Sequence, residues 1–244
     1  MTRAMRKRLQ RLMEAKPPLI RRGDPQQERV DTLYANQVRQ TLEILAGLSG
    51  DNAATVATAL SRSLHHACQQ AWQAAAEQFP EAPPKIHCRQ GCNWCCHEPL
   101  QVHILDAIGV ASANLPPLNY SLPTRQRASL KKIFKACPML VDGQCSVYEH
   151  RPVICRAYHS TDVAACQRVV EIQVAGRQIP MDLRLYGYTG LPQEATMKVL
   201  EELGIDRRPV VLGLAVAALQ QDFAGLTGNW LRGGDAFDPH TVQE

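Results

Sequence analysis

Apolar residues recur at helical spacing through the first third of the chain. A first helix is expected to begin at Pro25, with Asp24 as its N-cap, and to end at Gly47, because proline suits the first helical position and glycine stops a helical run. A second helix is expected between the cap Asp51 and Pro80. The apolar stripe of the second helix consists of Val56, Leu60, Leu64, Cys68, Trp72, Ala75 and Phe79. This pattern predicts two long helices and places Cys68 in the core.

The rest of the chain also favours helices. Further helical patterns cover residues 103–115, 125–135, 192–203 and 209–223. Only residues 170–179, where apolar and polar side chains alternate before a glycine, indicate a short hairpin. Residues 225–244 are glycine-rich at their start and are expected to be irregular. The sequence therefore predicts a mainly α fold, with a loop-dominated segment packed on helices and at most a small hairpin.

The composition is that of a globular chain with a core. Of its 244 residues, 45% are hydrophobic and 20% charged, which are ordinary values, and only 5% are aromatic. The proline-rich stretch from Pro80 to Lys85 is the best internal boundary. We therefore expect a helical N-terminal region over residues 1–80, a cysteine-bearing module over 86–166 and a mainly helical C-terminal region over 167–244.

Eight of the nine cysteines fall between Cys88 and Cys166. The first group has the spacing C-x3-C-x2-C-C and consists of Cys88, Cys92, Cys95 and Cys96. The second group consists of Cys137, Cys145, Cys155 and Cys166. It lies in a segment, residues 136–166, that lacks strong apolar periodicity. A segment of that length needs an organiser other than a core, and a metal centre is such an organiser.

Closely spaced thiolates repel one another unless a cation neutralises them, and they are preferred ligands of zinc and of iron–sulfur clusters. The eight clustered cysteines are therefore the predicted metal ligands. Neighbouring residues of an extended chain point to opposite sides. Cys95 and Cys96 would accordingly serve two centres, or one would bind while the other bridges or stays free. Eight thiols exceed the four that one zinc needs, which favours an iron–sulfur cluster, [4Fe–4S] before other types, over zinc.

Disulfide bonds fit this pattern poorly, because the cysteine count is odd and two cysteines are adjacent. The N-terminus has no apolar signal-peptide core. The longest apolar run, Pro209 to Leu219, has 11 residues, whereas a membrane span needs about 20. We expect a cytoplasmic protein, in which thiols stay reduced.

The net charge of +4 is unevenly distributed. Residues 1–22 carry eight basic side chains against the single acidic Glu14. Such an arm could contact nucleic acid, anionic lipid or an acidic protein, or could be a solvated helix. No aromatic side chains interleave these charges, which argues against nucleic acid. If the chain has a protein partner, the helical regions are where we expect it to bind.

The run C-x3-C-x2-C-C followed by C-P-x-L…C-x-[IV]-Y-x-x-R-P-x-x-C-R resembles the zinc- or iron-chelating cysteine-cluster family, often called YkgJ-like. The matching residues are Cys88, Cys92, Cys95, Cys96, Cys137, Pro138, Leu140, Cys145, Val147, Tyr148, Arg151, Pro152, Cys155 and Arg156. Cys166 is the best match to a further downstream cysteine of the family. The resemblance spans about residues 86–166 and implies that these cysteines hold zinc or an iron–sulfur cluster.

Three functions remain open at this point. The centre could be structural, or could relay metal or electrons. A related group, the flagellin lysine methylases, is associated with a [4Fe–4S] cluster, and the resemblance therefore implies a protein-modifying enzyme as an alternative. The third function is an interaction scaffold with a structural zinc. The chain shows no nucleophile motif, phosphate loop or separate cofactor motif, so no catalytic residue is predicted.

Cys88, Cys92 and Cys95 alone also have the spacing of radical enzymes that cleave adenosylmethionine on a [4Fe–4S] cluster. Those enzymes need a βα barrel, and the chain lacks the required alternation of strands and helices. Arg151 and Arg156 are expected either to offset the negative charge of a thiolate centre or to lie on the surface. Four histidines near the cysteines are expected to lie outside the ligand set: His87, His97, His150 and His159.

Overall fold

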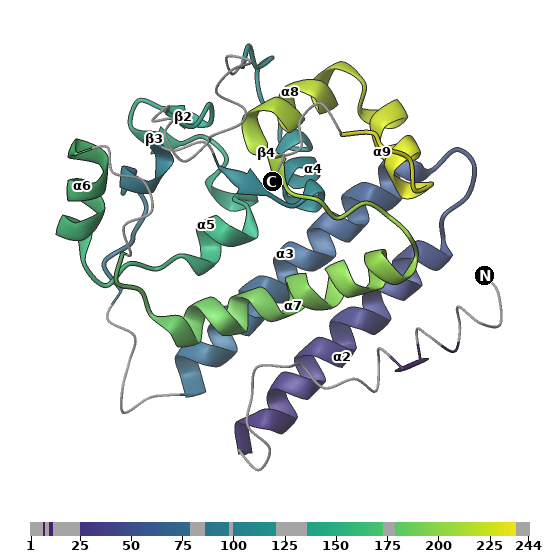
Figure 1. Cartoon of the computed structure of the whole chain (residues 1–244), viewed down its shortest axis with the longest axis horizontal. Helices are drawn as coiled ribbons and strands as arrows, with labels where there is room; N and C mark the ends of the chain where they lie inside the picture. Colours follow the sequence, from purple (N-terminus) through teal and green to yellow (C-terminus); the bar gives the residue numbers. More distant parts are fainter. Residues whose placement is uncertain are drawn as a thin grey trace.

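The computed structural model describes residues 7, 10–11, 25–78, 86–97, 100–120, 136–172 and 179–237. Within these ranges the protein is mainly α, as predicted (Figure 1). The helices are α2 (Pro25–Ala46), α3 (Ala53–Gln78), α4 (Ile104–Ala111), α5 (Val153–Ala157), α6 (Val163–Glu171), α7 (Leu183–Glu202), α8 (Leu212–Gln221) and α9 (Phe223–Leu231). Two short 3-10 helices, η1 (Trp94–His97) and η3 (Tyr148–His150), lie in the cysteine-bearing segment.

Helices α2, α3 and α7 each pack against the other two, and α3 lies at the centre of the molecule (Figure 1). Helix α3 contacts α2, α4, α5, α7 and α9. Most of its predicted apolar stripe is buried within the described residues, and Leu60, Leu64 and Cys68 are almost fully covered. The main core joins this stripe to α4, α8 and α9. The predicted start of α2 and its end before Gly47 are confirmed, whereas α3 begins at Ala53, so Asn52 rather than Asp51 directly precedes it.

The predicted start of α7 was wrong. The helix begins at Leu183, and Pro192 lies in its interior. Asp182 caps the true start, because its carboxylate accepts hydrogen bonds from the Arg184 and Leu185 backbone amides. Burial of α7 against α2 and α3 favours continuing the helix through the proline, at the cost of one backbone hydrogen bond.

Two other expectations were also wrong. Residues 163–171 form α6, so Val170 belongs to a helix and not to a hairpin strand. Asp162 starts this helix by accepting a hydrogen bond from the Ala165 amide at 3.1 Å. The helix predicted over residues 209–223 is interrupted at Asp222, which caps α9. Part of the supposedly irregular tail is therefore helical, because α9 buries Trp230 and Leu231 in the core.

Two antiparallel pairs of two-residue strands complete the described fold. β1 (Gln101–Val102) pairs with β4 (Val210–Val211), and β2 (Leu140–Val141) pairs with β3 (Gln144–Cys145). The β2–β3 hairpin turns at Asp142 and Gly143, both with positive φ, as expected of a tight Asp-Gly turn. Neither pair is parallel, so the described residues contain no βα barrel of the radical-enzyme type.

Several predictions fall outside the described residues, namely the linker Pro80 to Lys85, the helix over 125–135 and most of the basic arm. The division into three regions remains a prediction. Within the described parts, no helix combines the length and the apolar character that crossing a membrane requires.

Gly109 lets α4 approach α3 closely. A Cβ atom there would lie 2.5 Å from Ser61 Oγ and 2.7 Å from His65 Cε1. We expect Gly109→Ala to lower the free energy of unfolding by about 1–3 kcal/mol through overpacking. The matched control is Gly187→Ala in α7, where a Cβ would meet nothing within 4 Å. That variant should be neutral or slightly stabilising, since alanine is the better helix former. Urea unfolding of both variants tests this, and equal effects would contradict it.

Candidate metal centre

Cysteines from both groups line one small cavity of about 70 Å³. Three come from the first group and three from the second: Cys92, Cys95, Cys96, Cys137, Cys145 and Cys155. Arg151 and Tyr148 also line it, together with apolar side chains such as Leu100 and Met139. The structure thus brings together six of the eight predicted ligands.

Turns and backbone hydrogen bonds position the first group. Gly91 has a φ of 87°, a conformation that glycine adopts without strain. The Cys92 amide then donates to the Arg89 carbonyl at 3.0 Å, and the Cys96 amide to the Asn93 carbonyl at 2.9 Å. These bonds coil the segment tightly, so that closely spaced cysteines face one cavity.

The two groups are joined directly through the backbone. The Cys137 amide donates to the Cys96 carbonyl at 2.7 Å. In addition, Asn93 Nδ2 donates to the carbonyl of Gly143 in the β2–β3 turn at 3.1 Å. Because β3 ends at Cys145, this contact also fixes that cysteine relative to the first group. The approach of the two groups is therefore built into the chain itself.

Cys88 and Cys166 lie beside the six-cysteine cavity and do not line it. The Ser160 amide donates to Cys88 Sγ at 3.1 Å. Cys166 Sγ lies 3.5 Å from the Asp162 carbonyl within α6. Burial raises the pKa of each thiol, and the nearby Cys92 and Cys95 raise it further. The two cysteines are thus neighbours of the cluster on its α6 side.

Three of the cavity thiols have a raised pKa and are harder to ionise than an ordinary cysteine. Burial raises the pKa of Cys155 well above its ordinary value, with smaller contributions from Cys95 and Cys137. Burial raises the pKa of Cys137 to about 11. A hydrogen bond with Cys96 raises the pKa of Cys95. A metal cation would reverse this preference, because it replaces the protons and neutralises the mutual repulsion.

The donor set fits zinc or iron by its chemistry, since clustered cysteine sulfur suits both. The spacing of the atoms is looser than a bound metal requires. Among the described residues, no three cysteine, histidine or acidic side chains are grouped closely enough to hold one ion. The backbone bonds gather the thiols around the cavity without bringing three of them within ligating distance of one point.

The two arginines of the motif have different positions. Arg151 lines the cavity and stacks on the Tyr148 ring at 3.5 Å. Its charge lowers the pKa of Cys95, opposing the larger effects that raise it. Arg156 instead donates from Nε to the Arg151 carbonyl at 2.8 Å and from its guanidinium to the Glu149 carbonyl. Arg151 is therefore a cation in the lining of the cavity, whereas Arg156 holds the loop.

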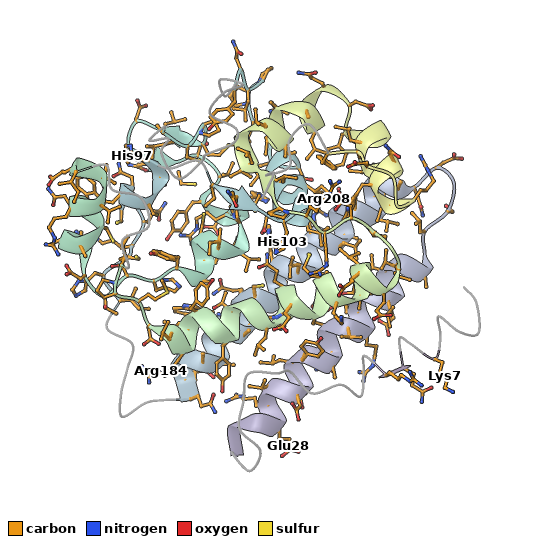
Figure 2. The ribbon with its side chains drawn as sticks, viewed as in Figure 1. Lys7, Glu28, His97, His103, Arg184 and Arg208 are labelled. Atoms are coloured by element: carbon orange, nitrogen blue, oxygen red, sulfur yellow. The ribbon has the colours of Figure 1, made fainter. Side chains whose placement is uncertain are left out.

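The four nearby histidines lie outside the six-cysteine cavity. His159 packs on the Trp72 ring, with 5.8 Å between ring centroids, and burial lowers its pKa. His97 ends η1 on the side of the molecule that carries β2, β3 and α6 (Figure 2). Cys68, as predicted, is fully buried in the main core.

Sequence patterns did not single out Asp106, which is 1% exposed. Its carboxylate accepts a hydrogen bond from the Val153 amide at the start of α5, two residues before Cys155. The sequence feature that could have identified it is a single acidic residue within the apolar helical stretch Ile104–Ala111. Buried carboxylates are rare unless they have partners, so that pattern alone could have indicated a structural role.

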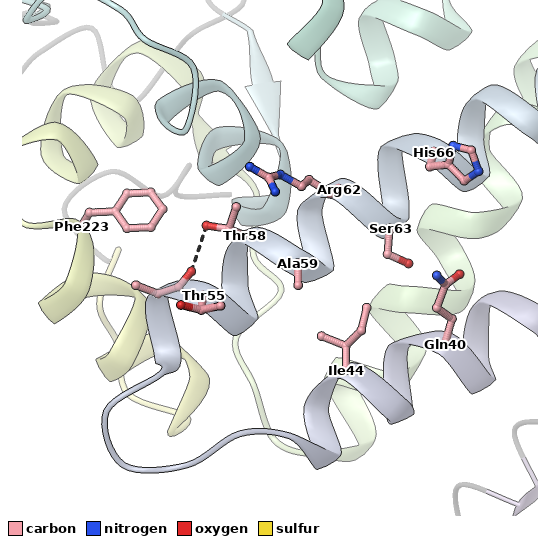
Figure 3. A pocket seen from close by; sticks show the side chains of 10 residues that line it. Gln40, Ile44, Thr55, Thr58, Ala59, Arg62, Ser63, His66 and Phe223 are labelled. Atoms are coloured by element: carbon pink, nitrogen blue, oxygen red, sulfur yellow. Dashed lines mark hydrogen bonds between the residues drawn. The ribbon is translucent and has the colours of Figure 1, made fainter.

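A larger hollow of about 690 Å³ lies between α2, α3 and Phe223 at the start of α9 (Figure 3). Arg62 and His66 border it, and Ile44 and Phe223 provide apolar surface. No cysteine lines it. The thiol chemistry is therefore confined to the other cavities.

Residues 87–175 match the family model CxxCxxCC, described as a putative zinc- or iron-chelating domain. The matched segment contains all eight clustered cysteines and confirms the resemblance seen in the sequence. No curated protein and no solved structure matches the chain.

Ligand and core cysteines can be distinguished by substitution. Cys155→Ser should remove metal and increase protease sensitivity over residues 86–166, because metal-binding energy is largely the folding energy of such loops. Cys68→Ala should keep its metal and lose only about 1 kcal/mol of stability, from a small cavity. Metal per chain and limited proteolysis are measured side by side. Metal loss in Cys68→Ala with retention in Cys155→Ser would contradict the assignment.

Proposed function

We propose, from the match of residues 87–175 to a zinc- or iron-chelating family, that this protein binds a metal centre through thiolates of both cysteine groups. The observation that carries the proposal is the cavity lined by three cysteines from each group. Such a concentration of thiols offers no packing advantage, and the raised pKa values show what it costs to ionise them without a cation.

We further propose that the centre is an iron–sulfur cluster, [4Fe–4S] before other types. Six thiols around one cavity, with Cys88 and Cys166 beside it, exceed the four that a single zinc uses. A shared or bridging position for Cys95 is supported by its placement, because it lines the six-cysteine cavity together with Cys137 and Cys155 and also lines a neighbouring cavity together with Cys166. The role we favour is electron or metal relay, or stabilisation of the surrounding loops.

Anaerobic purification tests the type of metal. An iron–sulfur protein should be brown, with broad visible absorption that bleaches on reduction, and should contain iron and acid-labile sulfide. The measurements are the visible spectrum and elemental analysis of the untagged full chain. A colourless protein with stoichiometric zinc would contradict the cluster and support the scaffold with structural zinc. A protein without either metal would contradict metal binding itself.

A second candidate is a reactive centre, as in a protein-modifying enzyme. A cavity of about 230 Å³ adjoins the six-cysteine cavity and shares Cys95, Cys155 and Leu100 with it. Its remaining lining is mostly apolar, with Trp94, Ile154, Tyr158, Cys166, Val169, Val170 and Ile179. Reactive metal sites keep one side accessible, whereas structural sites are closed. This apolar chamber beside the thiols is the observation that favours the candidate.

A larger side chain in this apolar chamber tests whether the centre is reactive. Val169→Phe should leave the iron content unchanged but slow the bleaching of the cluster by dissolved oxygen, a small apolar molecule, because access narrows. Val141→Phe, on the exposed face of the hairpin, is the control and should bleach at the wild-type rate. Stopped-flow absorbance gives the rates. Equal rates in all three proteins would remove the support for a reactive centre.

A further inference from the structure

Asp106 is the one charged residue of α4 and is 1% exposed. Its helix otherwise consists of apolar residues that belong to the main core. A carboxylate in such a position is costly unless hydrogen bonds compensate its lost hydration. Its partners therefore indicate what the residue does.

The Asp106 carboxylate joins four helices. Oδ1 accepts from the Val153 amide of α5 at 2.8 Å and lies 3.1 Å from His65 Nε2 of α3. Oδ2 accepts from Gln193 Nε2 of α7 at 3.1 Å. Gly109, one turn further along α4, leaves the space into which the His65 ring fits. One side chain thus links the cysteine-bearing α5 to α3 and α7.

Helix α5 depends on this contact for its start. The residue at its N-cap is Pro152, which has no polar side chain and makes no capping hydrogen bond. The first amides of a helix lack partners within the helix and need an external acceptor. Asp106 supplies that acceptor to Val153 from a different element. Cys155, two residues on, projects from this short helix into the six-cysteine cavity.

We infer that Asp106 is the positioning residue of the metal centre: it caps α5 from α4 and thereby holds the Cys155 sulfur at the cavity. The expected effect of Asp106 on metal retention rests on the proposed function. Its effect on the position of Cys155 is independent of that proposal. Helices α3 and α7, outside the matched family segment, then contribute to the centre through His65 and Gln193.

The experiment compares Asp106→Ala, which removes the acceptor, with Asp106→Asn, which keeps one oxygen for Val153 while Gln193 can turn its amide. Iodoacetamide labelling of Cys155 in the metal-free full chain is followed by peptide mass spectrometry. We expect labelling in Asp106→Ala to rise several-fold, because the Cys155 sulfur loses its fixed position, and labelling in Asp106→Asn to stay near wild type. With metal bound, release to a chelator should follow the same order.

Trp230→Phe is the control for general destabilisation. It removes the hydrogen bond from Trp230 Nε1 in α9 to the Asp206 carbonyl, and α9 lies away from the cysteine loops (Figure 1). It should lower the melting temperature without raising Cys155 labelling. If Asp106→Ala does not fold, amide hydrogen exchange of the wild-type chain tests the cap instead. The Val153 amide donates to Asp106, so it should exchange as slowly as the amides of α3.

Four results would overturn the inference. These are wild-type labelling in Asp106→Ala, an equal rise in Asp106→Asn, an equal rise in Trp230→Phe, and fast exchange at Val153. An equal rise in both Asp106 variants would show that the lost charge, and not the lost cap, activates the thiol. Purification of the wild type without metal would instead contradict the proposed function. The labelling experiment would still test the role of Asp106, because it uses the metal-free chain.

Discussion

Burial of α3 is the constraint on which the rest of the structure depends. Its apolar side chains lie against α4, α7 and α9 at once, and Leu60, Leu64 and Cys68 are almost fully covered. Burying such side chains is worth about 1.5–3 kcal/mol each for the larger ones. The cysteine loops have no comparable apolar stripe. They are supported from outside, by the helical body around α3.

The loops meet that body at a few defined contacts. Helix α5 is packed against α7, and the two cysteine groups are joined by the bond from the Cys137 amide to the Cys96 carbonyl. The buried Asp106 carboxylate adds a further contact, because it accepts a hydrogen bond from the Val153 amide of α5. The protein itself therefore sets the approximate positions of the sulfurs.

The sequence correctly predicted the features that depend on residues within one segment. The glycine after Ala46 and the stripe of α3 lie within single segments, and both appear where expected. The helix start predicted at Pro192 was wrong. Proline is a local signal for a helix start, but here packing of α7 against α2 and α3 outweighs that signal. The hairpin predicted at Val170 was wrong because Val170 belongs to α6. The Asp162 cap that starts this helix lies before the alternating run from which the hairpin was predicted. The spacing of the cysteines identified the donor chemistry, but not the separation of Cys88 and Cys166 from the other six, which arises from three-dimensional packing.

The pairing of β1 with β4 has a consequence for synthesis. It joins Gln101–Val102, just after the first cysteine group, to Val210–Val211, so the chain between them forms a closed loop that contains the second group. Pairings so distant in sequence form late in folding. At about 5–20 residues per second of translation, the last clustered cysteine, Cys166, is made roughly 2–9 s before Val210. During that interval all eight thiols have been synthesised, but the strand that closes the loop around the second group has not.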